Sequence, residues 1–222
     1  GSPAVIQQNL FRDNTQPGAS SGHSIYADNF TAGGALIGLQ VDNNTFTNTS
    51  LVVGSWAMGM SNTAATPFSD ISFTNNTVTN HGRGAYFYNS TNSIVSGNMI
   101  SGTTNYAVGV FDIDPTVPGS TNIAVTNNTL SNNFRGIWVD NFPEAPVDGL
   151  AYTGSLDLSG NTITGGGTGI SIIEPNVTSV NLTGVTISGT STPSTIQIAG
   201  SLSYDGGAGG ETIISTAASF AV

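Results

Sequence analysis

Apolar and polar side chains alternate in a short pattern that returns along most of the chain. The pattern is a six-residue motif with an apolar residue at its fourth position, at residues 8–13, 43–48, 75–80, 97–102, 127–132, 160–165 and 184–189. Its ends are Asn or Gly in every copy but the first, which begins with Gln8 and ends with Asp13. Successive copies begin 22 to 35 residues apart. Alternation with period two predicts a short strand in each copy, with one side facing inward and the other outward.

A second motif follows each copy and also alternates. Its first apolar residue is Ile25, Met58, Ala85, Val108, Ile137, Ile170 or Ile196. Strands that recur once per repeat, separated by Asn or Gly corners, stack into parallel sheets when the chain coils, with neighbouring turns about 4.8 Å apart. We therefore predict an all-β parallel coil. A two-layer sandwich of antiparallel hairpins is the alternative, but it does not explain repeats that match in register.

Stacked repeats predict columns of like residues. The apolar column of the first motif is Phe11, Phe46, Val78, Ile100, Leu130, Ile163 and Ile187. The second position of that motif is Asn9, Asn44, Asn76, Asn98, Asn128 and Asn161, and it becomes Val185 in the last copy. Side-chain amides stacked at this spacing can bond to one another, so we expect an asparagine ladder along one corner that ends at Val185.

The pattern N-N-T-h-x-N followed by x-G-h-x-h-x-N, where h is apolar, resembles the repeat of the pectin-lyase-like superfamily over residues 5–200. The resemblance implies a right-handed parallel β-helix of about seven turns, which we assign to residues 1–200. Residues 201–222 lack both motifs, and we predict that they form a C-terminal cap or a junction to a further module. The superfamily includes lyases, hydrolases, epimerases and non-catalytic surface proteins, so the resemblance alone assigns no reaction.

Charge and composition exclude several partners. The 222 residues include three Arg, no Lys and 13 Asp or Glu, for a net charge of −10. Such a chain repels phosphate backbones and anionic membrane surfaces. No apolar run reaches the roughly 20 residues of a membrane-spanning helix. The absence of Cys fits an extracellular or cell-surface protein of bacterial type, and the opening Gly1-Ser2 is expected for a module of a larger chain.

Two arginines are candidates for a catalytic base. Lyases that share the resemblance abstract a proton with Lys or Arg, often with Ca²⁺ beside the uronate. Arg83 and Arg135 occupy the same motif position, two turns apart, with Tyr106 between them. The plainer interpretation is an exposed column in which the guanidinium groups stack on Tyr106.

Carboxylates gather in one region of two successive turns. Asp112 and Asp114 end one strand, and Asp140 and Glu144 end the strand one turn later. Carboxylates stacked about 5 Å apart suit a retaining glycosidase. The alternative is that the same four residues are solvated or hold a structural Ca²⁺; no cofactor other than this calcium is expected.

An aromatic column is the candidate glycan-binding site. Tyr26, Tyr86 and Trp138 fall on alternate turns of an outward column with Gly between them. A spacing of about 10 Å suits a linear polysaccharide. The predicted binding set is Tyr26, Tyr86, Tyr88, Phe111, Trp138, Asp140 and Asn141, with Asp112 also bonding to sugar hydroxyls. The alternative is that a loop covers these rings.

The sequence thus favours a non-catalytic, extracellular carbohydrate-binding or adhesive β-helix module with a polysaccharide or glycan as partner. A polysaccharide lyase or glycoside hydrolase is the alternative. A minor alternative is an ice-binding solenoid, because the first motif presents Thr-x-Thr rows that Met99 interrupts. Strand propensity alone also explains these threonines.

Overall fold

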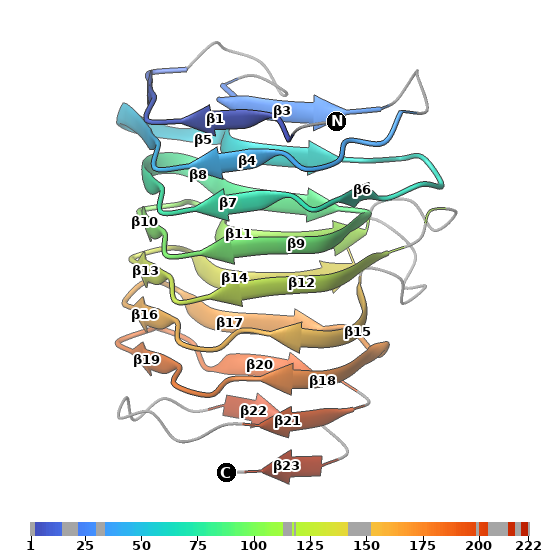
Figure 1. Ribbon diagram of the computed structural model, residues 1–222. Coiled ribbons are helices and arrows are strands. Elements are labelled where there is room, and N and C mark those ends of the chain that lie inside the picture. Colours follow the sequence, from blue (N-terminus) through green and yellow to red (C-terminus); the bar gives the residue numbers. More distant parts are fainter. Residues whose placement is uncertain are drawn as a thin grey trace.

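The computed structural model describes residues 3–14, 22–29, 34–112, 117, 119–141, 152–198, 200–203, 213–215 and 219–221. All regular secondary structure within these residues is β-strand, and the strands pair in parallel to form two sheets. The strands stack one above another between an N-terminal and a C-terminal end (Figure 1). No helix among the described residues is long and apolar enough to cross a membrane.

The first sheet contains one strand from each turn of the coil. In stacking order these strands are β1 (Val5–Gln7), β4 (Gln40–Asp42), β7 (Ser72–Thr74), β9 (Ser90–Ser96), β12 (Ser120–Thr126), β15 (Tyr152–Asp157), β18 (Val177–Asn181), β21 (Ser201–Ser203) and β23 (Ser219–Ala221). The short strand β6 (Phe68–Ser69) also pairs with β9.

The second sheet is bent into two arms. The short arm contains β2 (Leu10–Arg12), β10 (Met99–Ser101), β13 (Thr129–Ser131), β16 (Thr162–Thr164) and β19 (Thr186–Ser188). The long arm contains β3 (Ile25–Asp28), β11 (Tyr106–Asp112), β14 (Arg135–Asn141), β17 (Thr168–Ile173), β20 (Ser194–Gln197) and β22 (Ile213–Ser215). Two continuous strands, β5 (Thr45–Ser61) and β8 (Thr77–Tyr88), run through both arms.

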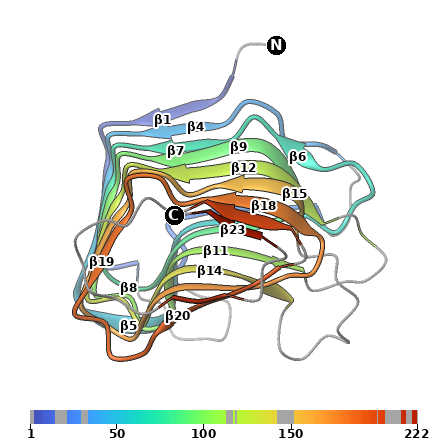
Figure 2. The ribbon, with the colours of Figure 1, turned by 90° about the horizontal axis from the view of Figure 1, so that it is seen from below.

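Each turn passes through the first sheet, the short arm and the long arm in that order. One turn is β9, β10 and β11, and the next is β12, β13 and β14. Seen along the axis, equivalent strands of successive turns lie over one another (Figure 2). The predicted all-β parallel coil is therefore confirmed, and the antiparallel sandwich is wrong.

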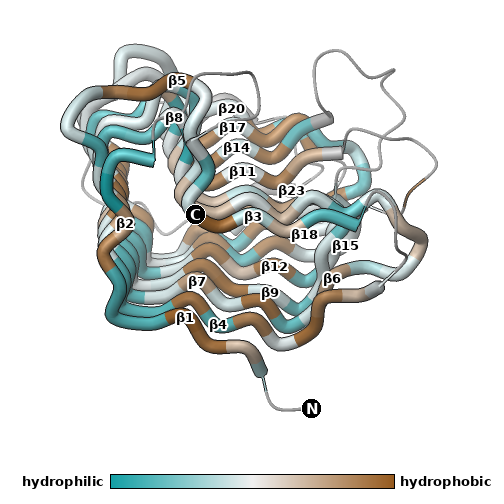
Figure 3. The backbone as a smooth tube through the Cα atoms, turned by 90° about the horizontal axis from the view of Figure 1, so that it is seen from above, coloured by the Kyte–Doolittle hydropathy of each residue, from teal (hydrophilic) through white to brown (hydrophobic). Residues whose placement is uncertain are grey.

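The interior is built from the predicted apolar columns. In the short arm the register joins the whole first-motif column from Phe11 to Ile187. Phe46 to Ile187 are buried, and the ring of Phe11 stacks on that of Phe46 with centroids 4.7 Å apart. The first sheet shows the same layering, with hydrophobic positions repeating at matched places of successive strands (Figure 3).

The corner between the first sheet and the short arm, called here the ladder corner, contains the predicted asparagine ladder. The backbone N–H of each ladder residue from Asn9 to Asn128 donates to Oδ1 of the next, at 2.8–3.0 Å. Each Nδ2 donates to the same oxygen at 2.9–3.2 Å. The ladder ends at the buried Val185, as expected.

Backbone conformation explains why the first motif favours Asn or Gly at its ends. The residue before each ladder position has a positive φ: Gln8, Asn43, Asn75, Gly97, Asn127, Gly160 and Gly184. The last motif position does too in six copies: Asp13, Asn80, Gly102, Asn132, Gly165 and Gly189. Gly and Asn occupy this region at the lowest cost. The motif therefore marks two left-handed bends around one three-residue strand.

The last turn differs from the predicted register. Ile196 pairs with Ile172 and not with Ile170, and Gln197 pairs with Ile173. The second-motif column is therefore correct from Ile25 to Ile170 and shifted by two residues at Ile196. In the preceding turn the chain advances seven residues from Ile163 to Ile170, and the same advance from Ile187 reaches Ser194, so Ile196 lies two residues too far along the chain to join the column. Beyond residue 200, β21, β22 and β23 continue the parallel stacking.

Candidate functional site

The outer face of the long arm contains a row of aromatic and cationic side chains, called here the cation–aromatic row. It consists of His23, Trp56, Arg83, Tyr106 and Arg135. Trp56 pairs with Arg83, and Arg83 pairs with Tyr106 in the neighbouring strands. These residues therefore follow one another up the stack, one per turn.

Contacts within the row alternate between ring and guanidinium. The imidazole of His23 stacks on Trp56 with centroids 4.2 Å apart. The Arg83 guanidinium lies 5.3 Å from the Trp56 ring centroid and 5.9 Å from that of Tyr106. The predicted stacking of Arg83 on Tyr106 is thus confirmed. Arg135 instead lies over Trp138 at 4.0 Å and over Phe134 at 4.8 Å.

The neighbouring aromatic column has the predicted register but not the predicted exposure. Tyr26, Gly59, Tyr86, Gly109 and Trp138 are successive partners in the long arm. Tyr86 is only 5% exposed and Trp138 only 7%, whereas Tyr26 is 42% exposed. The expectation that all three rings stand open on a binding face is therefore wrong for Tyr86 and Trp138.

The glycines between these rings do not leave open slots. A Cβ at Gly59 would lie 2.3 Å from the Trp56 ring, so that ring occupies the space above Gly59. A Cβ at Gly109 would lie 2.4 Å from Phe111 and 2.6 Å from Tyr106. Each glycine therefore makes room for a ring from an adjacent position, and the outer face is filled.

The rings form a second apolar cluster outside the main core. Its buried members are Tyr86, Tyr88, Tyr106, Phe111, Val117 and Trp138, with Trp56 packed against them. Tyr88 and Phe111, both expected in the glycan site, are fully buried. The alternative of covering by a loop agrees with the burial of Val117, which lies between β11 and β12. Large rings at adjacent positions also cover one another.

The carboxylate cluster is described only in part. Asp140 accepts a hydrogen bond from the Trp138 indole N–H at 3.2 Å. It pairs with Phe111, while Asp112 pairs with Asn141, so Asp112 and Asp140 are not stacked directly. Asp114 and Glu144, and the side chains of Asp112 and Asn141, lie outside the described residues. Within the described part of the chain, no three His, Cys, Asp or Glu residues gather in a group that could hold a metal ion.

Burial sets the electrostatics of the row. It lowers the pKa of His23, and the Arg83 charge lowers it further. Burial also lowers the pKa of Arg135, against an opposing effect of Asp140. The phenol of Tyr106 has a raised pKa because it is buried. At neutral pH the row therefore presents neutral rings around the two guanidinium groups.

Sequence reasoning missed Trp56, His23 and Phe134. Trp56 and His23 stand two residues before Met58 and Ile25, the same offset that separates Arg83 from Ala85. Extending that column by two turns would have found both. Phe134, 55% exposed, follows an Asn-Asn corner and belongs to neither motif, so no repeat signal marks it.

The short arm presents the threonine rows expected of the minor alternative. Thr45 pairs with Thr77, Met99 separates Thr77 from Thr129, and Thr129 pairs with Thr162. Met99 is 57% exposed and breaks the array of hydroxyl and methyl groups. Ice binding stays a prediction without further support from this face.

The fold and its repeat define a solenoid protein. A family model described as a right-handed β-helix region matches residues 1–174. The chain belongs to this right-handed β-helix family. Neither the curated proteins nor the solved structures gave a match to the chain.

Proposed function

We propose that this protein is a non-catalytic, extracellular carbohydrate-binding or adhesive β-helix module of a larger secreted or surface protein. The observation that supports this proposal is the cation–aromatic row. Rings and guanidinium groups are held in fixed stacks there, with Tyr26 beside them 42% exposed. Rigid aromatic surfaces with few ordered polar groups suit sugar rings, because little entropy is lost on binding.

The accessible part of this face differs from the predicted platform. Tyr86, Tyr88, Phe111 and Trp138 support the face from below, because they are buried in the second cluster. Tyr26 and the partly exposed Trp56 offer ring surface, and their centroids are 5.8 Å apart. Arg83 and Arg135 supply hydrogen-bond donors toward sugar oxygens.

A glycan array tests the proposal directly. The wild type is compared with the double variant Tyr26→Ala, Trp56→Ala and with a control, Leu10→Ala, Met99→Ala, whose side chains are exposed on the short arm. We expect the wild type and the control to bind the same glycans. The face variant should lose about tenfold or more in affinity, as aromatic anchors do. Absence of any binding by the wild type would reject the proposal.

A polysaccharide lyase is the second candidate, and one observation favours it. Burial lowers the pKa of Arg135, which is the direction that a proton-abstracting guanidine requires. A screen of uronic and neutral polysaccharides, with and without Ca²⁺, tests this candidate and the hydrolase together. Unsaturated product that disappears in Arg135→Gln would support the lyase. New reducing ends without unsaturation would support the hydrolase, and neither product would remove both.

A further inference from the structure

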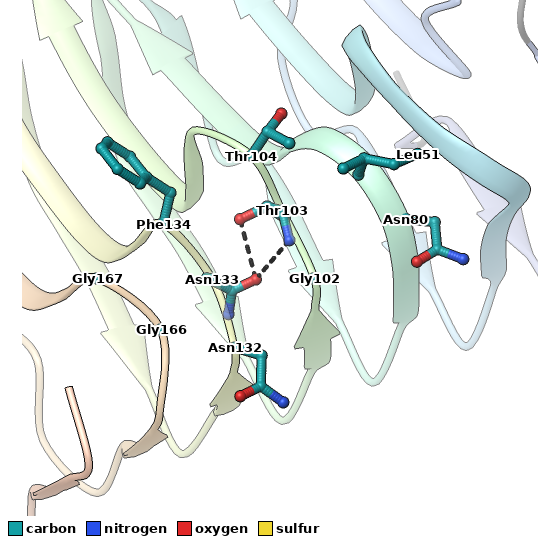
Figure 4. A pocket seen from close by; sticks show the side chains of 10 residues that line it. All are labelled: Leu51, Asn80, Gly102, Thr103, Thr104, Asn132, Asn133, Phe134, Gly166 and Gly167. Carbon is teal, nitrogen blue, oxygen red and sulfur yellow. Dashed lines mark hydrogen bonds between the residues drawn. The ribbon is translucent and has the colours of Figure 1, made fainter. Parts of the chain in front are cut away.

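An open hollow lies at the second corner of the coil, between the short arm and the long arm, called here the hollow corner. Its volume is about 530 Å³, within the range of small-ligand sites. Phe134 and Leu51 stand on opposite sides of it, with Thr104 between them (Figure 4). No residue of the cation–aromatic row and none of the residues expected to bind glycan is among the described residues that line it, although Arg135 of the row contacts Phe134.

Insertions at this corner create the walls. From Thr47 to Met58 the strand β5 advances eleven residues, while its partner β8 advances only six, from Thr79 to Ala85. The five extra residues form a projecting segment in which Leu51 is exposed. Such insertions leave the ladder corner and the core columns in register, so they change only this surface.

The floor of the hollow is flat because glycines lie directly against the turn before them. A Cβ at Gly166 would be 2.0 Å from the carbonyl oxygen of Asn133, and one at Gly167 would be 2.3 Å from that of Phe134. Beneath them, Asn133 Oδ1 accepts hydrogen bonds from the N–H and hydroxyl of Thr103, at 3.0 and 2.9 Å (Figure 4). Close contact between turns therefore fixes the floor and leaves space above it.

Phe134 supplies a prepared aromatic wall. The Arg135 guanidinium lies 4.8 Å from the ring centroid and restrains the ring. More than half of the Phe134 surface is nevertheless exposed. Phe134 is not part of the second apolar cluster, so packing of that cluster does not explain the ring.

Amide groups at the rim complete the site. Asn132 is exposed, and its side chain has no hydrogen-bond partner among the described residues. Asn80 donates from Nδ2 to the Asn48 carbonyl at 3.0 Å, which leaves its Oδ1 as an acceptor. Among the described residues, no Asp, Glu, Lys, Arg or His lines the hollow. The available polar groups are therefore neutral donors and acceptors.

We propose that this hollow binds one neutral sugar residue of a glycan, with its apolar face on Phe134 and its hydroxyls bonded to the amides of Asn132 and Asn80. The inference rests on the proposed glycan-binding function and assigns a second site to it. An anionic sugar is disfavoured because the lining offers no cation and the chain has a net charge of −10. A ring on one side and amides on the other match the two sides of a pyranose.

Calorimetric titration with neutral glucose-, mannose-, galactose- and xylose-based oligosaccharides tests the site, with oligogalacturonate as the acidic comparison. We expect at least one neutral series to bind and oligogalacturonate not to compete for the same site. Phe134→Ala should weaken neutral binding about tenfold, and Phe134→Tyr should retain it. Asn132→Gly, which keeps the positive φ, should weaken it about threefold.

The outer-face variant Tyr26→Ala, Trp56→Ala separates this inference from the proposed function. If neutral binding is lost in that variant but unchanged in Phe134→Ala, the hollow is not the site and the proposed function stands. If the wild type binds only acidic glycans, the inference is overturned alone. If the wild type binds no glycan of either kind, both fail. Thermal unfolding of each variant shows whether the fold is intact, and Phe134→Tyr remains decisive if Phe134→Ala unfolds.

Discussion

The two corners that flank the short arm begin alike and behave differently. Both contain left-handed residues next to the same three-residue strands, such as Asn127 before β13 and Asn132 after it. At the ladder corner one amide per turn is buried, and it bonds to the amides of the turns on both sides. At the hollow corner the chain length varies from turn to turn.

The difference shows where a solenoid accepts variation. A ladder amide must meet its neighbours in both directions, so an extra residue would leave several buried groups unpaired. The hollow corner has no continuous ladder. The buried amide of Asn133 bonds only to the turn before it, at Thr103 and Ile100, and extra residues project outward from this corner. A constant chain length at the ladder corner therefore preserves the fold, whereas a variable chain length at the hollow corner shapes the surface there.

The largest expected effect comes from deleting one amide at each corner. Asn98→Ala would remove the acceptor for the Asn76 N–H and the donor to the Phe73 carbonyl, both buried. Each such loss costs about 1–3 kcal/mol, so we expect the free energy of unfolding to fall by about 4 kcal/mol. Asn133→Ala loses bonds to Thr103 and Ile100 beside the hollow, where water can replace them, and should cost about 2 kcal/mol.

Urea denaturation of the two variants measures this difference, and Asn132→Gly is the matched control. Asn132 is exposed, and its positive φ suits glycine, so this change should cost less than about 0.5 kcal/mol. Equal losses in Asn98→Ala and Asn133→Ala would show that a ladder amide is no more important than an amide that bonds to one neighbouring turn.

Most of the coil could be predicted from the sequence because its determinants repeat. The column from Phe11 to Ile187 and the ladder from Asn9 to Asn161 each require the same residue type at the same place in every turn. A repeated requirement leaves a repeated pattern. The register failed at Ile196, where the second motif is least regular.

The outer face was less predictable because alternation gives the direction of a side chain and not its exposure. Tyr86 and Trp138 do point away from the core, yet rings from the adjacent positions and Val117 bury them. The Arg135 guanidinium stacks on Trp138, three residues later in the chain, and not on Tyr106 in the neighbouring strand. Contacts of this kind depend on ring size and rotamer, which are not repeated and leave no period in the sequence.

A pH titration also separates the corners, because among the described residues a buried titratable side chain, His81, lies at the hollow corner. His81 follows Asn80 there, is fully buried, and has no hydrogen-bond partner for either ring nitrogen among the described residues. Burial lowers the pKa of His81 from 6.5 to about 4. The neutral form is thus favoured in the folded state, and the unfolded state binds the proton first as the pH falls.

The stabilising contribution is complete above pH 6.5 and is lost progressively as the pH falls toward about 4, for a total on the order of 3 kcal/mol. The free energy of unfolding, measured from pH 7.5 to 4, should fall more steeply in the wild type than in His81→Gln. The two proteins contain the same carboxyl groups, so the difference between the two curves reports on residue 81. Parallel curves would mean that His81 reaches water in the folded state.

Two glycines of the ladder corner test how tightly its turns pack. Gly160 and Gly184 both have φ +69°, so an added Cβ strains both backbones equally. At Gly160 that Cβ would also lie 2.2 Å from Asn127 Oδ1, whereas at Gly184 its closest contact is an ordinary 3.7 Å. Gly160→Ala should therefore destabilise by about 2 kcal/mol more than Gly184→Ala.

Chemical denaturation of both variants, together with Gly160→Ala combined with Asn127→Gly, completes this test. Removing the Asn127 side chain removes the clash, so the second change should restore most of the difference. Additive losses in the double variant would place the cost in the backbone alone and not in contact between turns.

The smallest expected effect concerns the stack beside the hollow corner. Arg83→Gln removes a guanidinium from between Trp56 and Tyr106, and at this partly exposed position we expect the free energy of unfolding to fall by only about 0.5–1 kcal/mol.

A sharper measurement of the same contact is the pKa of His23 by NMR titration. Burial lowers this pKa first and the Arg83 charge adds to it, so removing the charge should move the pKa upward, toward its ordinary value. Arg135→Gln is the matched control, because Arg135 lies beyond Tyr106 and contacts Trp138 and Phe134 instead. A His23 pKa that rises equally in both variants would point to a general change in net charge, and one that rises in neither would place the Arg83 guanidinium too far away to act. A rise in Arg83→Gln alone would establish that the row is held in one fixed order, in contrast to the variable chain lengths of the corner next to it.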